Sequence, residues 1–404
     1  MPRTLLPIVA AWLVLMAPVS RATQATPRLI AVGDIHGALA PFLEILQHAG
    51  LVNEGGRWSG GQAVLVQTGD YTDRGPDVRA VLDRLIALER EAAAAGGRVV
   101  VLLGNHEVMN LLGEQRDVTP AIYASFADGD SEARRRDAWE KYAALARARA
   151  RQRDPLPEVY AQTRESWMAA HPPGWLEYRE AFARRGHYGR WLRSRPIAAR
   201  VGGALFMHAG VNPLAPPRDL EAIEAGVREE IARMDRFVER LVDRRLALPF
   251  FSMTEILAVA AAEVSHVNAH LAEARERNRP PDLSESEVAL VREAAAVLQI
   301  GSWDVLAEHG PLWYRGYATS PDDVLREPLT RLLDRYRVSR IIVGHSPMQA
   351  RRIQARLDGR IVLIDTGMLA AAYMGRASAL DLAADGLTAI YADGRQSLAV
   401  TPRR

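Results

Sequence analysis

The sequence LIAVGDIHG at residues 29–37 joins a short apolar run to a turn that carries an aspartate and a histidine. Two later segments share this form: AVLVQTGDYTDRG at 63–75 and RVVVLLGNHE at 98–107. Short apolar runs bounded by glycine and polar residues predict buried β-strands. Helical patterns separate the segments, so the order of strand, polar loop and helix predicts a mixed α/β core.

Polar residues follow the predicted strands at regular intervals. Asp34, Asp70 and Asn105 are 36 and 35 residues apart, about one strand–helix unit each. Loops at the carboxyl ends of strands gather ligands in such sheets. Apolar runs at 204–207 and 340–343 likewise end in histidines. We therefore expect six side chains to converge: Asp34, His36, Asp70, Asn105, His208 and His345.

These six side chains offer carboxylate oxygen, amide oxygen and imidazole nitrogen. That donor set suits Mn²⁺, Fe or Zn²⁺, whereas Ca²⁺ prefers more oxygen. The chain has no cysteine, which excludes disulfides, thiolate ligands and a cysteine nucleophile. His266 and His270 are four residues apart on an expected helix, but no third ligand is evident. We interpret that pair as a solvated helical face.

The loops GDIHG, GDYTDRG and GNHE resemble the signature loops of the calcineurin-like metallophosphoesterases, in particular the phosphoprotein phosphatase branch. HAG at 208–210 stands where most members have HGG, and VGHSP at 343–347 matches the later histidine motif. The WYRG and DTGM segments and an export signal make the chain look most similar to the bacterial Shewanella-like protein phosphatases. The resemblance covers roughly residues 28–112, 195–212 and 308–393.

This resemblance implies an α/β fold with four layers, an α/β/β/α sandwich of mixed sheets. It implies one metallophosphoesterase domain over residues 26–404, with helical insertions at about 113–194 and 213–300. The first insertion is basic: residues 131–200 hold fifteen arginines and one lysine against eight acidic residues. Either these arginines form solvated helix faces, or they draw anionic substrate toward the site.

The resemblance also implies a site with two divalent metal ions, manganese first, with iron or zinc as alternatives. Asp34, His36 and Asp70 would hold one ion, and Asp70 would bridge to the other. Asn105, His208 and His345 would complete the second. Two metals in a bridged site lower the pKa of a shared water, so that a bridging hydroxide attacks phosphorus in line.

Four further residues are expected to donate a proton to the substrate, to orient that donor or to bind the phosphate group. His106 is the candidate general acid for the leaving oxygen, and Asp73 would orient it. The alternative for His106 is a hydrogen-bonding role only. Arg74 would bind phosphate oxygens, and the resemblance suggests the same for Arg315, whose alternative is an ordinary surface arginine. We expect Glu107 to support the site.

The N-terminus predicts export. Arg3 precedes an apolar run over 5–19, and Ala22 or Ala25 offers a cleavage site, as in a signal peptide. An uncleaved membrane anchor is the alternative. Removal of 1–25 takes away two arginines and no acids, so the formal charge falls from +2 to zero. We therefore expect a periplasmic protein that binds no nucleic acid and does not insert stably into the membrane after cleavage.

The predicted activity is hydrolysis of phosphate monoesters on a phosphorylated protein, at serine, threonine or tyrosine, or on a small phosphoester. One alternative is a nucleotide or dinucleoside polyphosphate hydrolase. The other is a catalytically silent fold used for binding.

Overall fold

The computed structural model describes residues 27–153, 155–383 and 386–399. The expected signal peptide lies outside these residues. Within them, no helix combines the length and the apolar character needed to cross a membrane.

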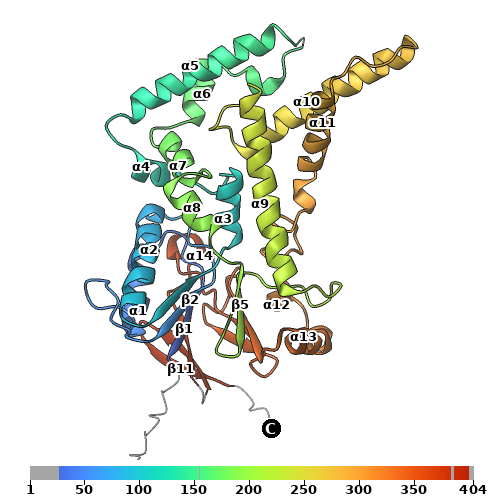
Figure 1. Ribbon diagram of the computed structural model, residues 1–404. Coiled ribbons are helices and arrows are strands. Elements are labelled where there is room, and N and C mark those ends of the chain that lie inside the picture. The colour runs from blue at the N-terminus through green and yellow to red at the C-terminus, as the bar shows by residue number, and fades with distance from the viewer. Residues whose placement is uncertain (1–26, 154, 384–385, 400–404) are drawn as a thin grey trace, which may run out of the picture.

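Two mixed β-sheets form the centre of the molecule (Figure 1). The first has the order β11-β10-β9-β1-β2-β3, and the second has the order β4-β5-β6-β8-β7. The first comprises β1 (Leu29–Val32), β2 (Val64–Gln67), β3 (Arg98–Val101), β9 (Ala379–Ala383), β10 (Gly386–Tyr391) and β11 (Gly394–Leu398). The second comprises β4 (Ala198–Val201), β5 (Ala204–Met207), β6 (Arg340–Val343), β7 (Gln354–Arg356) and β8 (Ile361–Leu363).

Side-chain alternation along the strands builds the layers. Leu29 and Ala31 of β1 belong to a core shared with Phe206 of β5, whereas Ile30 and Val32 belong to the core that faces the helices. Successive side chains of a strand point to opposite faces, so the two sheets pack against each other and helices cover their outer faces. Helices α1 (Leu39–His48), α2 (Val78–Ala94), α12 (Gly316–Thr319) and α13 (Asp322–Tyr336) are the outer helices. The predicted four-layer α/β/β/α fold is confirmed.

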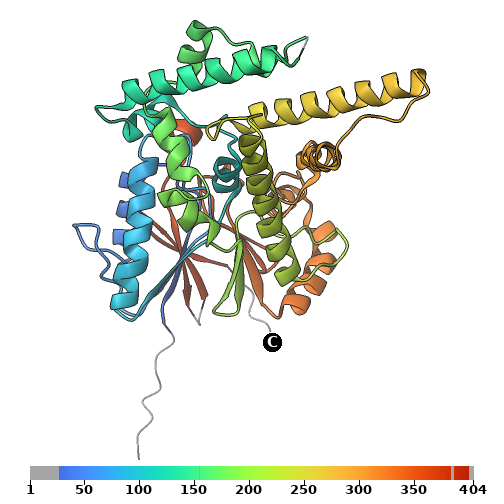
Figure 2. The same ribbon diagram turned by 45° about the horizontal axis from the view of Figure 1, so that its top comes forward.

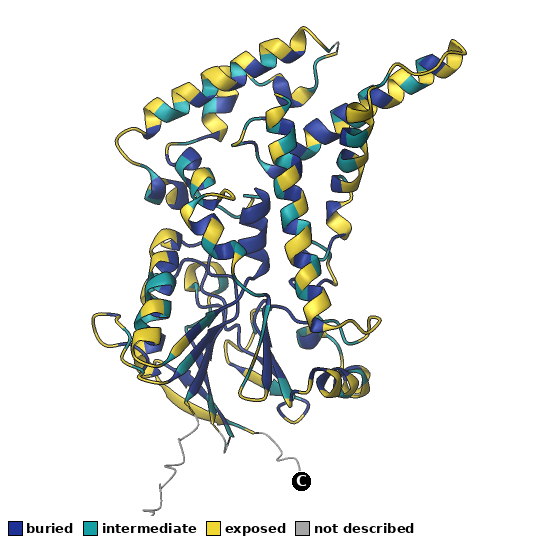
Figure 3. Ribbon diagram, in the orientation of Figure 1, coloured by how far each residue is buried: buried dark blue, intermediate teal, exposed yellow. Residues whose placement is uncertain are grey.

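Strand direction brings the loops to one edge. Strands β1, β2 and β3 are parallel and in register, and so are β5, β6 and β8. Their carboxyl ends therefore lie on the same side of the sandwich, below the helices that rise in Figure 1. Helix α3 (Asn105–Leu112) begins directly after β3, and all eight of its residues are buried (Figure 3).

Helices fill both of the segments expected as insertions. The first holds α4 (Pro120–Phe126), α5 (Ser131–Ala150), η1 (Glu158–Tyr160), α6 (Arg164–Ala170), α7 (Trp175–Phe182) and α8 (His187–Arg193). The second holds α9 (Leu220–Asp243), α10 (Met253–Glu276) and α11 (Glu285–Val297), followed by η2 (Ile300–Ser302). Helices α10 and α11 pack against each other, and the far end of α10 projects from the body (Figures 1 and 2).

Arginines of the basic segment tie the two insertions together. Arg149 and Arg153 both bind Glu263 of α10, at 2.6 and 2.7 Å, and Arg193 binds Asp235 of α9 at 2.7 Å. These pairs are largely buried, so each partner depends on the other to offset its lost hydration. They are structural contacts. Whether the remaining positive charge draws substrate stays a prediction.

The layer between the sheets should dominate the stability of the fold. Phe206 is fully buried there, and Phe206→Ala should lower the free energy of unfolding by about 3–5 kcal/mol. Leu214→Ala, at a side chain that is 52% exposed, is the control and should change it by less than about 0.5 kcal/mol. Urea unfolding of both variants in EDTA measures the difference. Similar losses for the two would contradict this account of the core.

Candidate active site

The loops that follow β1, β2 and β6 carry backbone strain. His36, Asp70, Asp73, Arg74 and His345 have φ angles of +46° to +68°, a region that residues other than glycine rarely adopt. Such conformations persist where the surroundings impose them, and they cluster at functional sites. Here the backbone N–H groups of residues 35 and 36 donate to the carbonyl of Asp70 at 2.9 Å. The loops after β1 and β2 therefore hold each other in place.

The carboxylate of Glu107 fixes the loop after β2. It accepts five hydrogen bonds, from the backbone N–H groups of Asp70, Tyr71, Thr72 and Gly104 and from the Thr72 hydroxyl, at 2.7–2.9 Å. Because Glu107 lies in the first turn of α3, these bonds set the distance between that helix and Asp70. The geometry matches the supporting role expected for this residue.

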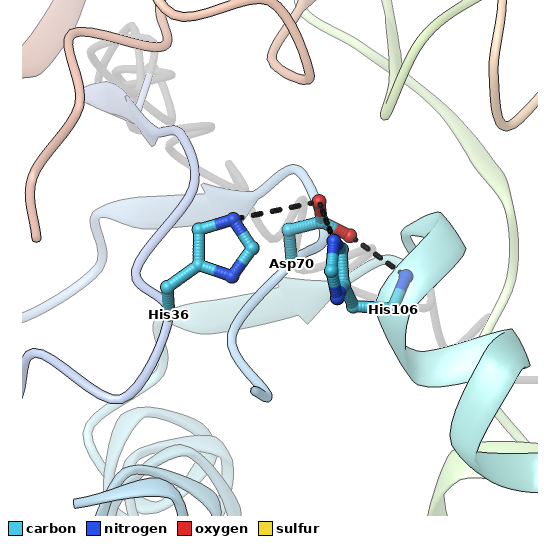
Figure 4. Close-up of side chains that lie close together, drawn as sticks. All are labelled: His36, Asp70 and His106. Carbon is cyan, nitrogen blue, oxygen red and sulfur yellow. Dashed lines mark hydrogen bonds and ion pairs between the residues drawn. The ribbon is translucent and has the colours of Figure 1, made fainter. Parts of the chain in front are cut away.

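The structure brings metal-type side chains into two groups that share Asp70. In one, donor atoms of His36, Asp70 and His106 lie within 4.8 Å of one another (Figure 4). In the other, donor atoms of Asp70, His208 and His345 do so. The Oδ1 atom of Asn105 joins the second group, 2.8 Å from Nε2 of His208. Asp70 thus occupies the place expected of a bridging ligand.

Asp34 lies beside these groups and not within them. Its two carboxylate oxygens accept the backbone N–H of His345, at 3.1 and 3.2 Å. Its pKa is raised well above the ordinary value by burial and then by the carboxylates of Asp365 and Asp70. Asp365 was missed in the sequence analysis. It follows β8, so the same strand-end rule applied to DTGM would have found it.

The electrostatics of this cluster fit divalent cations. Asp34, Asp70 and Asp365 are all buried, and close buried carboxylates repel one another unless a proton or cation lies between them. Burial lowers the pKa of His36 to about 3, and it lowers that of His345 far below the usual range. Both imidazoles are therefore neutral, as metal ligands must be.

His106 is part of a chain of buried hydrogen bonds. Its Nδ1 atom lies 2.7 Å from a carboxylate oxygen of Asp73. Asn110 donates to the other Asp73 oxygen at 2.8 Å, and the hydroxyl of Tyr178 donates to Asn110 at 2.6 Å. Burial alone would lower the pKa of His106, but the carboxylates of Asp70 and Asp73 outweigh it and raise that pKa. The two carboxylates therefore favour the protonated imidazole relative to a free histidine.

Asn110 and Tyr178 were also missed in the sequence analysis. Asn110 is one helical turn beyond His106, a spacing that places both on one face of α3. No local signal connects Tyr178 of α7 with Asn110, because 68 residues separate them in the sequence.

A cavity of about 230 Å³ opens onto the cluster. The two arginines expected to bind phosphate line it, but both make protein contacts. A terminal guanidinium nitrogen of Arg74 lies 2.8 Å from Nε2 of His36. Arg315 donates to the carbonyl of His345 at 2.8 Å, so it is not an isolated surface arginine. The aromatic residues Trp313 and Tyr373 also line the cavity, Trp313 beside His345 and Tyr373 beside His36.

The expected solvated face on α10 agrees with the structure. His266 is half-buried and His270 exposed. Their ring centroids are 4.1 Å apart, but among the described residues neither belongs to a group of three metal-type side chains.

The sequence pattern of the calcineurin-like phosphoesterases matches residues 27–237, which carry five of the six expected metal ligands. The chain belongs to that family. The phosphoesterase is 29% identical to an uncharacterised protein of Schizosaccharomyces pombe over 355 residues, which cover 87% of this chain and 75% of that protein. The family match and the buried Asp–His cluster together show an enzyme that acts on phosphate esters.

Two further relatives match the phosphoesterase over shorter stretches. It is 46% identical to Shewanella-like protein phosphatase 2 of Arabidopsis thaliana over 92 residues, 23% of this chain and 24% of that protein. It is 37% identical to Shewanella-like protein phosphatase 1 of Plasmodium berghei over 107 residues, 26% of this chain and 30% of that one. These matches support a phosphatase function.

A solved structure shares the fold of the phosphoesterase. The cold-active protein-tyrosine phosphatase of a psychrophilic Shewanella species aligns with a TM-score of 0.56 at 20% identity. The alignment covers 92% of this chain and 80% of that one. At this identity the likeness shows the fold alone.

The chain of hydrogen bonds behind His106 should affect turnover. Tyr178→Phe removes the donor to Asn110, which leaves a buried acceptor unpaired and loosens Asp73. A loss of about 1 kcal/mol corresponds to a kcat about fivefold lower, with little change in KM because Tyr178 does not line the active-site cavity. Steady-state kinetics on p-nitrophenyl phosphate measures both constants.

Tyr123→Phe is the matched control. This buried tyrosine packs edge-on against Tyr178 with 5.5 Å between ring centroids, and its hydroxyl makes no hydrogen bond to any described residue. Equal kcat values for the two variants would show that the Tyr178 hydroxyl does not act on the site.

Proposed function

We propose that this phosphoesterase is a protein phosphatase that uses two divalent metal ions and favours phosphotyrosine over phosphoserine and phosphothreonine. The ions, manganese first, would bind Asp34, His36, Asp70, Asn105, His208 and His345. One observation carries the proposal: His106, hydrogen-bonded to Asp73, lies beside the shared Asp70 in a cavity that Trp313 and Tyr373 also line.

The two nitrogens of His106 have different surroundings, and this supports its role as general acid. Nδ1 faces Asp73 at 2.7 Å, whereas Nε2 faces the metal-type cluster, 3.8 Å from Asp70. A proton on Nε2 is therefore available to a leaving oxygen, and Asp73 keeps the ring oriented. When bound, two divalent ions supply an activated water and withdraw charge from the phosphate oxygens.

The walls of the cavity support a phosphorylated aromatic residue as substrate. Arg74 and Arg315 line it with guanidinium groups, which match phosphate oxygens geometrically. Trp313 and Tyr373 also line the cavity, and aromatic rings pack favourably against a tyrosyl ring. Two relatives are protein phosphatases by name, and the Shewanella protein that shares the fold is a protein-tyrosine phosphatase, which supports this choice.

Replacement of the general acid tests the mechanism. His106→Asn should lower kcat about 10²–10⁴-fold on a phosphotyrosine peptide. The loss should be smaller on p-nitrophenyl phosphate, because that leaving group needs less protonation. His270→Asn, at an exposed histidine of α10, serves as the control and should leave kcat unchanged. Equal rates for His106→Asn and the unmutated enzyme, with Mn²⁺ present, would exclude the proposed acid.

A substrate panel tests the specificity and the metals together. After chelation with EDTA the enzyme should be inactive, and Mn²⁺ should restore more activity than Mg²⁺ or Ca²⁺. Relative kcat/KM should rank a phosphotyrosine peptide above phosphoserine and phosphothreonine peptides. Faster cleavage of a dinucleoside tetraphosphate would favour the nucleotide hydrolase instead. No activity with any divalent metal would favour a binding module.

We also propose that the enzyme is exported to the periplasm, because residues 1–25 have the charge, apolar run and small residues of a signal peptide. Protein recovered from a periplasmic fraction should begin at Thr23 or Thr26, as read by N-terminal sequencing. A chain that retains Met1 in the membrane fraction would point to an uncleaved anchor.

A further inference from the structure

A second cavity lies among the helices, away from the candidate active site. Its volume is about 490 Å³, within the usual range for small-ligand pockets. Helices α3, α7, α8 and α9 enclose it, together with the loop before α10; these helices adjoin one another in Figures 1 and 2. No residue lines both this cavity and the one that contains Asp70. The two cavities are therefore distinct, although Asn110, which binds Asp73, lines the second one.

The guanidinium of Arg179 lines this cavity and forms no ion pair with a described carboxylate, although the charge of Glu255 acts on it from farther away. Arg179 donates to the carbonyl of Phe251 at 2.8 Å. Its Nε atom is buried without any hydrogen-bond partner, and Arg179 makes no ion pair with the described residues. Burial lowers the pKa of this guanidinium. A buried cation that lacks a partner is costly, so the cavity favours an anion at this position.

Three other arginines line the wall, and one of them, Arg185, is exposed and forms no ion pair with the described residues either. Arg184 pairs with Glu239 at 2.8 Å, and Arg193 pairs with Asp235 at 2.7 Å. Carboxylates of α9 therefore neutralise Arg184 and Arg193, whereas Asp243 of α9 lines the cavity without an ion pair among the described residues. Attraction for an anion therefore comes from Arg179 and from the exposed Arg185.

The rest of the wall is largely apolar. Apolar side chains come from four of the surrounding segments: Leu112, Phe182, Met234, Val238, Val242 and Phe251. An inorganic anion would leave this surface in contact with water, whereas an organic anion would cover it and gain hydrophobic free energy. The lining therefore matches a ligand with an anionic head and an apolar body.

We propose that this cavity binds a small amphipathic organic anion, whose carboxylate pairs with Arg179 and whose apolar chain lies against Met234 and Val238. The guanidinium of Arg179 lines the cavity without an ion-pair partner among the described residues, and charge-assisted bonds between a guanidinium and a carboxylate are strong. The site is distinct from phosphate recognition, because it contains no metal-type cluster and shares no residue with the catalytic cavity.

Isothermal titration of the full-length Mn²⁺-loaded protein with sodium decanoate tests the site. Decanoate, below its micelle-forming concentration, should bind saturably to one site, and saturating vanadate in the catalytic cavity should not displace it. Acetate lacks the apolar chain and decyltrimethylammonium has the opposite charge, so neither should bind there. Displacement by vanadate, or equal binding of decyltrimethylammonium, would overturn the proposal.

Three variants locate the bound decanoate. Arg179→Met keeps much of the side-chain volume and should weaken binding at least about tenfold, since a hydrogen bond to a charged group is lost. Arg184→Gln removes a charge from the same wall, but that charge is already paired; it is the control and should change affinity less than about twofold. Val238→Trp fills the cavity and should weaken binding as much as Arg179→Met.

Arg179→Met and Val238→Trp test the proposed binding site independently of each other. Equal decanoate affinity in Arg179→Met and the unmutated protein would overturn the assignment of the head group. If Arg179→Met does not fold, the decanoate affinity of Val238→Trp tests the site, because this variant keeps the arginine. Unchanged affinity in that variant would show that decanoate binds elsewhere.

Discussion

The carboxylate of Glu107 connects α3 to the loop after β2 through hydrogen bonds, and the geometry of the site depends on these bonds. Five donors converge on it, and four of them are backbone groups, so the bond network fixes the main chain itself. Asn105 and His106 lie just before Glu107, and Asp70 is one of the residues it binds. A single buried anion thus sets the distance between residues that come from two strand ends.

This arrangement explains how loops with unfavourable backbone angles remain in place. Left-handed conformations at His36, Asp70 and Asp73 each cost free energy. Hydrogen bonds between the loops and to Glu107 offset that cost only when all the loops are folded together. The site is therefore formed cooperatively with the ends of the strands, which the parallel sheets align.

Much of the fold and site followed from the sequence because the signals were local. Each expected ligand stands directly after a strand, and parallel strands bring their carboxyl ends to one edge whatever the intervening helices do. The same rule explains why Asp34 was found, but not that its carboxylate would turn toward Asp365. That contact depends on how two loops from different sheets meet, which no residue spacing encodes.

The contacts missed from the sequence are those made by the insertions. Arginine enrichment at 131–200 was visible, yet the pairing of Arg149 and Arg153 with Glu263 joins positions more than a hundred residues apart. Tyr178 gave no signal for the same reason. Composition reveals that a segment is basic. Only the three-dimensional packing decides which arginines form ion pairs and which, like Arg179, do not.

The hydrogen bond from Tyr178 to Asn110 has a consequence for engineering this protein. The loops of the site follow strands of the two sheets, whereas α7 lies in the helical segment between β3 and β4. Because Asn110 takes its hydroxyl partner from that segment, the helices cannot be exchanged without affecting the site. A helical segment taken from another protein would not restore turnover unless it brought its own partner for Asn110.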